Sequence, residues 1–181
     1  MIKKGVITMK KLLSVVLIVA LSCIALFPAY AADDNLIATD EFLVQFTLYA
    51  ALLNTGHALS TENADEITHF SDMVLFKTIF NKCEILSLIL TPDGKEVTSI
   101  KCTWSTLTPG ASAYSEDFFY LLMEVLCACG MDTDSIADLL VDLGMNNAFD
   151  VGDSGEATAD GIKVSYEVTS TFGVSFKIEK A

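Results

Sequence analysis

The sequence predicts an α+β domain: about three helices packed on one face of a roughly five-stranded antiparallel sheet, after an N-terminal signal peptide. Two segments at the C-terminal end alternate apolar and polar residues, as strands buried on one side do. A Pro-Asp-Gly turn joins two further segments rich in β-branched residues. Apolar residues at helical spacing form separate blocks. Because helices and strands are segregated along the chain, an α+β arrangement is favoured over alternating βαβ units.

Residues 1–31 have the three parts of an export signal in the usual order. A lysine-rich head precedes an apolar run, Leu12–Phe27, and small residues at Ala29 and Ala31 form an A-x-A cleavage site. We expect cleavage after Ala31. The remaining residues 32–181 would then form a single domain that is secreted or held at the cell surface, and the short lysine-only head is typical of bacterial signals.

Two alternatives to cleavage are an uncleaved anchor and lipid attachment. The run Leu12–Phe27 is shorter than the roughly 20 residues that a membrane span needs. Cys23 lies in an Ala-Leu-Ser-Cys sequence that loosely resembles a lipobox, but the apolar run continues past it. We therefore expect no stable membrane span once the signal is cleaved.

The charge of the chain excludes several classes of partner. Four of the 11 basic residues, and none of the 24 acidic ones, lie within residues 1–31, so a formal charge of −13 becomes −17 on cleavage. Nucleic-acid binding and binding to anionic membranes both need clustered Lys and Arg. We expect neither. Acidity favours solubility, with attraction to cations or to a basic partner as the alternative.

The first predicted helix begins at Thr39, the expected cap, and ends before Gly56. Its apolar residues recur at helical spacing and also occupy other sides, which predicts burial on more than one side. Residues 32–38 are expected to be a loose lead-in. Residues 57–72 are polar and are expected to be a connector, with a short element around 67–70 as the alternative.

Three strands are expected next, over 73–80, 84–91 and 96–105, with turns at 81–82 and 91–95. The second turn is the clearest local signal, because proline presets its first angle and glycine accepts a left-handed one.

The pairing of this hairpin decides whether two cysteines can bond. With 93–94 as a two-residue loop, Cys83 faces Trp104. In the same register Cys102 faces Ile85, so the thiols lie diagonally and too far apart for an easy disulfide. A one-residue bulge would place them on opposite faces. We expect core packing beside Trp104.

A second helix is expected from a cap at Ser112 or Ser115 to Gly130. Its apolar C-terminal half contains Cys127 and Cys129, which point about 200° apart and cannot bond to each other. Four cysteines after residue 31 permit two disulfides in three connectivities, but a domain of this size needs none. We expect the two helical cysteines to pack as small apolar side chains.

A third helix is expected to begin at Asp132 or Thr133 and to end before Gly144. Residues 145–161 are rich in Asn, Asp and Gly and are expected to be a loop. Its carboxylates are a weak candidate for a calcium site: Asp150, Asp153, Glu156 and Asp160.

The last predicted elements are strands over 162–169 and 174–179, joined by a turn at 170–173. Their alternation predicts one dry face and one solvated face, with Tyr166 and Phe176 pointing into the core.

No recognisable catalytic, metal-binding or phosphate-binding motif occurs in the sequence, and no cofactor is expected. His57 and His69 lie in the polar connector and are expected at the surface. A pairing of His69 with Cys83 is the remaining nucleophilic possibility. We expect an exported, non-enzymatic domain that binds an unknown protein, peptide or cell-wall partner. A small secreted enzyme with a dispersed site and a calcium-responsive surface protein are the alternatives.

Overall fold

The fold is that of a computed structural model, which describes residues 35–81, 83–105, 116–145, 149–170 and 173–181. The expected signal peptide and the expected helix caps Ser112 and Ser115 lie outside these residues. No helix within the described ranges is long and apolar enough to cross a membrane.

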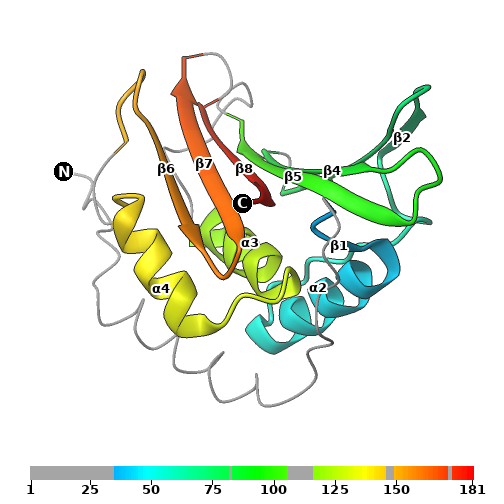
Figure 1. Cartoon of the computed structure of the whole chain (residues 1–181), viewed down its shortest axis with the longest axis horizontal. Coiled ribbons are helices and arrows are strands. Elements are labelled where there is room, and N and C mark those ends of the chain that lie inside the picture. Colours follow the sequence, from blue (N-terminus) through cyan, green and yellow to red (C-terminus); the bar gives the residue numbers. More distant parts are fainter. Residues whose placement is uncertain (1–34, 82, 106–115, 146–148, 171–172) are drawn as a thin grey trace.

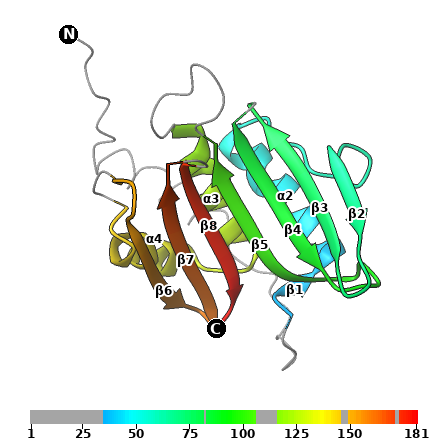
Figure 2. The same cartoon turned by 90° about the horizontal axis from the view of Figure 1, so that it is seen from above.

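The described strands form one antiparallel sheet of eight strands, not the predicted five. They run in the order β2-β3-β4-β5-β8-β7-β6, and the short β1 also pairs with β5 (Figures 1 and 2). Their bounds are β1 Ile37–Ala38, β2 Glu66–His69, β3 Val74–Phe80, β4 Glu84–Leu90, β5 Glu96–Trp104, β6 Ser154–Ala159, β7 Ile162–Thr169 and β8 Gly173–Lys180.

The three additional strands are β1, β2 and β6, in segments that we expected to be a lead-in, a connector and a loop. The alternative of a short element near 67–70 is confirmed by β2. Each of these strands is short or weakly apolar, as in the Ser-Gly-Glu-Ala-Thr-Ala sequence of β6. Such strands form because a neighbour supplies hydrogen bonds, so their own sequences lack the apolar alternation that marks a strand.

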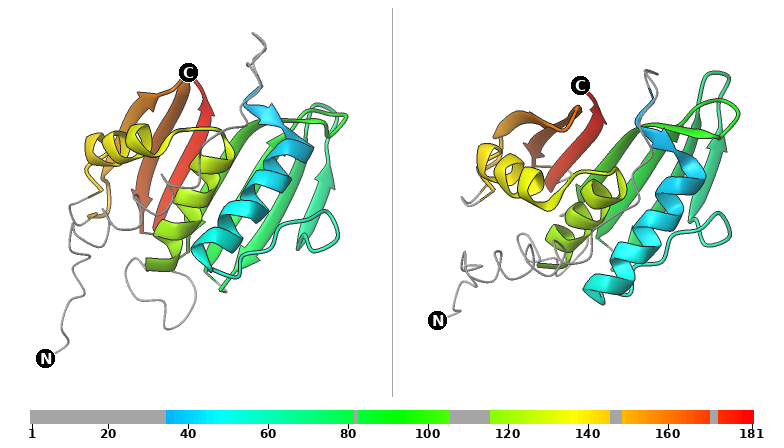
Figure 3. Two further views of the ribbon diagram at one scale, coloured as in Figure 1. Left: turned by 90° about the horizontal axis from the view of Figure 1, so that it is seen from below. Right: turned by 60° about the horizontal axis from the view of Figure 1, so that its bottom comes forward.

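Three helices, α2 Thr39–Leu53, α3 Glu116–Ala128 and α4 Thr133–Asp142, cover one face of the sheet, as predicted. Figure 3 shows α3 lying between the other two in this layer. Burial alternates along β3 and β4, with every second residue pointing toward the helices. In the C-terminal hairpin, Phe176 is fully buried and Tyr166 partly buried, which confirms the predicted dry face.

The cap predicted for α2 is wrong. Ala38 occupies the N-cap position without a side-chain hydrogen bond, and Thr39 is already the first helical residue. The helix ends where predicted, before Gly56, because Asn54 adopts a left-handed conformation with φ of 55°.

The predicted register of the β4–β5 hairpin holds next to the turn, where Leu90 pairs with Val97, but it is wrong by one residue beyond a bulge that lies in β5 and not in the turn itself. The register shifts between Ile89 and Leu90, so Cys102 pairs with Leu86 and Glu84 pairs with Trp104. The turn itself closes as predicted, because the Thr91 N–H donates to the Glu96 carbonyl, and the shift arises where β5 contributes the extra residue Thr98 between Val97 and Ser99.

The N-terminus of α4 gives a first testable prediction. The Asp132 carboxylate accepts hydrogen bonds at 2.9 Å from the N–H groups of Asp134 and Ser135. Hydrogen bonds from Ser135 hold the pKa of Asp132 below its ordinary value. Asp132→Ala should therefore lower the free energy of unfolding by about 1 kcal/mol in urea denaturation. The matched change Asp138→Ala, at an exposed position within the helix, should alter it by less than about 0.5 kcal/mol. Equal losses would show that the cap bonds contribute nothing.

Candidate functional site

The face of the sheet opposite the helices carries the most accessible group of functional side chains. Figure 2 shows the strands in front of the helices, and no described helix lies on this face. We call it the open face. Because antiparallel partners that lie directly opposite each other project to the same side, the pairing register determines which residues meet on it.

A single cross-strand row runs over the open face from β3 to β6. Each member lies directly opposite the next member on the neighbouring strand. The row consists of Lys77, Ser87, Lys101, Lys177, Ser165 and Glu156. Two lysines therefore occupy adjacent positions at the centre of the sheet, between hydroxyl groups on either side.

The twisted sheet is hollowed where this row crosses β8, β7 and β6. The resulting groove has a volume of about 560 Å³. On the same face the Thr103 and Ser175 hydroxyls, both buried, lie 3.0 Å apart. The groove is lined by Lys101, Ser154, Gly155, Glu156, Ser165, Tyr166, Glu167, Ser175 and Lys177.

The charges in the groove are unevenly matched. Lys101 lies directly opposite Lys177, a like-charge pair that destabilises a sheet. Lys177 has an ion pair with Glu179, and Lys163 has one with Glu156 at 2.7 Å. Among the described residues, Lys101 has no carboxylate partner within ion-pair distance. The exposed Lys101 ammonium is thus available to an external anion.

An apolar patch adjoins the basic row on β3 and β4. Ile79 lies opposite Ile85, and Leu75 lies opposite Ile89. Ile79 is 41% exposed, and the other three side chains are partly exposed. We call these four residues the apolar corner. The open face therefore offers aliphatic contacts at one end and cationic and hydroxyl groups at its centre.

A second group of functional side chains lies on the other side of the sheet, in the interior. His57 follows α2, and its Nδ1 lies 2.7 Å from Oε2 of Glu124 on α3. Its Nε2 lies 3.6 Å from Oε2 of Glu84, on the helix-facing side of β4. The Thr55 hydroxyl donates to Glu124 at 2.6 Å, and the Asn81 amide donates to Glu84 at 3.2 Å. We call these five residues the His57 cluster.

The His57 imidazole is held in its charged form. Burial lowers its pKa, but the hydrogen bond to Glu124, the close approach of Glu84 and the negative charge of both carboxylates outweigh that effect and raise the pKa to about 9. The three side chains are only 4%, 1% and 0% exposed. The expected surface position of His57 is therefore wrong. A substrate has no access to these groups in this structure, which makes the cluster an internal ion-pair network.

The cysteines lie in the interior as well. Cys83, Cys102, Cys127 and Cys129 are all buried, and none of these four forms a disulfide within the described chain. Burial raises the pKa of the Cys102 and Cys129 thiols. Buried protonated thiols are poor nucleophiles. The prediction that Cys127 and Cys129 pack as apolar side chains is confirmed.

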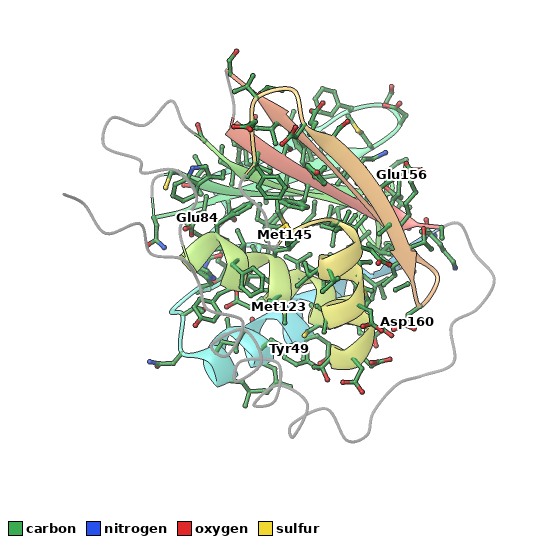
Figure 4. The ribbon with its side chains drawn as sticks, turned by 90° about the vertical axis from the view of Figure 1, so that its left-hand side faces the viewer. Tyr49, Glu84, Met123, Met145, Glu156 and Asp160 are labelled. Carbon is green, nitrogen blue, oxygen red and sulfur yellow. The ribbon has the colours of Figure 1, made fainter. Side chains whose placement is uncertain are left out.

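The acidic segment 145–161 does not form the calcium site that we considered. Asp153 accepts from the Asp150 N–H, and Glu156 forms the ion pair with Lys163 on the open face. Asp160 lies in the turn at the far end of β6 from Asp153, and Figure 4 shows Glu156 and Asp160 at separate places. No group of three or more metal-ligating side chains is found among the described residues.

The second histidine, His69, lies at the end of the edge strand β2 and is exposed, as expected. Strand pairing places it opposite Val74, whereas Cys83 is buried before β4. The two residues therefore lie at opposite ends of β3, and the considered pairing of His69 with Cys83 does not form.

In comparisons with known proteins, no family model, no curated protein and no solved structure matches the chain. A function must therefore be inferred from the geometry described above.

Two groups of functional residues were not predicted from the sequence, although a sequence pattern marks each of them. Glu84 and Glu124 are charged residues at positions whose neighbours face the core, a pattern that indicates a buried charge partner. Lys101 and Lys177 each occupy a polar position in an alternating strand. Their adjacency could not be predicted, because it depends on β5 pairing with β8 across 70 residues of intervening chain.

Proposed function

We propose that the chain is an exported, non-enzymatic binding domain whose open face receives a partner that presents acidic groups beside apolar side chains. The direct opposition of Lys101 and Lys177 on the uncovered side of the sheet carries this proposal. Export rests on the signal pattern of residues 1–31. The partner would be a protein, a peptide or a wall component with this chemistry.

The chemistry of the partner follows from the lysine charges of the open face, which are not all matched by carboxylates. Four of the seven lysines that follow residue 31 lie on it, namely Lys77, Lys101, Lys163 and Lys177, although the chain as a whole is strongly acidic. An anionic group placed between Lys101 and Lys177 would relieve their repulsion and accept charge-assisted hydrogen bonds. The apolar corner beside them would bury aliphatic groups of the same partner.

A binding role agrees better with the described side chains than a catalytic one. General acid–base and nucleophilic groups must reach a substrate. The histidine with a shifted pKa is sealed in the interior, and so are the buried thiols with raised pKa values. The groove itself is lined mainly by lysine, serine and glutamate side chains, of which Lys177 and Glu156 are engaged in ion pairs.

The proposal predicts that neutralising both central lysines abolishes binding of an acidic polymer. Poly-L-glutamate is the probe, and its affinity for the purified exported protein is measured by isothermal titration calorimetry at low salt. Lys101→Gln with Lys177→Gln should weaken binding by about tenfold or more, because each charge-assisted hydrogen bond contributes about 1.5–3 kcal/mol. Lys95→Gln with Lys180→Gln makes the same change in net charge away from the groove and should alter affinity by less than about twofold.

Equal weakening in both pairs of variants would show that only net charge matters, and absence of binding by the unmodified protein would contradict the proposal outright.

The stability of the protein gives a second test that needs no partner. Because Lys101→Gln removes a like-charge cross-strand contact, it should raise the free energy of unfolding by about 0.2–1 kcal/mol. A destabilised Lys101→Gln would mean that the lysine is structural.

A further inference from the structure

Beyond its first turn, the outward face of α2 is apolar and has no charged side chain. Val44, Leu48 and Leu52 are 65%, 50% and 42% exposed. They are spaced four residues apart, so they form one continuous ridge along the helix. No residue from Phe42 to Leu53 is ionisable except the buried Tyr49. A surface helix in a chain of net charge −13 would ordinarily carry charges on its solvated face.

A groove runs beside this ridge. It has a volume of about 380 Å³ and lies between α2 and the segment that follows it. Its lining is uncharged: Leu43, Val44, Thr47, Leu59, Ser60 and Thr61. A ridge of aliphatic side chains and an adjoining groove of matching chemistry are therefore present on the same surface.

We propose that α2 is a self-association surface, on which a second copy of this chain packs its own α2 in antiparallel orientation. A two-fold axis places the same patch on both partners, so the ridge of each copy can enter the groove of the other. Aliphatic side chains at a spacing of four residues form the ridges used in common helix–helix packing. The centre of the ridge, Leu48, would lie at the axis and meet its counterpart.

The uncharged strip permits a second copy to pack here, and the charges of the first turn select the orientation. Two copies of a strongly acidic chain repel each other over most approaches, and the uncharged strip from Phe42 to Leu53 lets them meet without opposing carboxylates. The acidic residues of α2, Asp40 and Glu41, lie in its first turn. Antiparallel packing places these first turns at opposite ends of the pair, whereas parallel packing would bring four carboxylates together.

The interface would be small. The 15 residues of α2 span roughly 22 Å, and a single helix face buries less than the roughly 800 Å² per partner of a stable complex. We therefore expect a dimer that forms at high protein concentration. Because α2 belongs to the helix layer, on the other side of the sheet from the open face, the pair leaves the open face and its groove accessible (Figures 1 and 3). The inference does not depend on the proposed function.

Sedimentation velocity of the exported protein, from about 1 μM to about 1 mM, tests the inference. The unmodified protein should shift from monomer to dimer over this range. Leu48→Glu should raise the dissociation constant at least tenfold, since it places two carboxylates at the axis. The matched control Val141→Glu changes an equally exposed aliphatic residue on α4 and should leave dimerisation unchanged. A protein that stays monomeric throughout, or Leu48→Glu that dimerises like the unmodified protein, would overturn the inference.

Cross-linking tests the orientation with a variant that keeps the surface neutral. Leu48→Cys should form a disulfide-linked dimer under mild oxidation, because position 48 meets itself at the axis. Val141→Cys should remain monomeric, and the four native cysteines described in the structure are buried and therefore protected. Linkage of Val141→Cys at the same rate would show random collision and contradict the antiparallel arrangement. Unfolding curves for each variant establish that it is folded before either measurement.

Discussion

Replacing His57 with alanine should lower the free energy of unfolding by about 3–5 kcal/mol. The imidazolium lies between the Glu84 and Glu124 carboxylates, and both are almost completely buried. Removing it would take the cationic partner away from both buried carboxylates, which would keep the hydrogen bonds from Thr55 and Asn81. A marginally stable domain has about 5–15 kcal/mol in total, so this loss would be a large fraction of its stability.

Urea denaturation followed by circular dichroism measures the effect, and His69→Ala is the matched control. His69 lies exposed on β2, so its removal should change the free energy of unfolding by less than about 0.5 kcal/mol. Where His57→Ala is too unstable for a folded baseline, its loss of cooperative thermal unfolding at neutral pH gives the same answer. Equal stability of the two variants would show that the His57 cluster contributes nothing to the fold.

The stability of the protein should fall as the pH rises from about 6.5 to 9. In the folded protein, burial lowers the pKa of His57, but the hydrogen bond to Glu124, the close approach of Glu84 and the charge of both carboxylates raise it to about 9. In the unfolded chain its pKa is about 6.5. A raised pKa in the folded state stabilises the protein fully below the unfolded value, and this stabilisation is lost as the pH passes through the folded value. A pKa difference of this size corresponds to about 3 kcal/mol.

Free energies of unfolding measured between pH 6 and 8.5 isolate the histidine. Burial raises the pKa of the Cys102 and Cys129 thiols, so unfolding releases thiol protons and adds a second loss of stability near and above pH 8.5. Within the lower window, His69→Ala should retain the slope of the unmodified protein, whereas a folded His57→Gln should lose it. A flat profile for the unmodified protein would show that His57 is neutral in the fold.

The elements that could be predicted from the sequence are those with a periodic pattern of apolar residues, which indicates burial on one side. The C-terminal hairpin and β3 to β5 alternate strongly, and α2 and α4 have apolar residues at helical spacing. The edge strands β2 and β6 could not be predicted as confidently, because exposed strands carry no apolar alternation. The β4–β5 register was wrong beyond Leu90 because the bulge at Thr98 shifts every later pair by one residue.

The candidate sites were less predictable than the fold. A histidine between polar residues, such as His57, is usually exposed, and only the approach of α3 and β4 places Glu124 and Glu84 around it. The ridge on α2 was interpreted as evidence for burial on several sides, yet Val44, Leu48 and Leu52 are exposed. Apolar spacing shows that a helix face avoids water. It cannot show whether the fold itself covers that face or leaves it uncovered.

Sequence alone determined the class of this protein: helices and antiparallel strands in separate blocks, with an acidic chain behind an expected export signal. Those properties follow from local periodicity, turn residues and net charge, which each segment carries by itself. Tertiary structure alone decided that Lys101 meets Lys177 and that His57 lies between two buried carboxylates. Both depend on pairings between residues distant in the chain, which form only when strand register and helix packing bring them together.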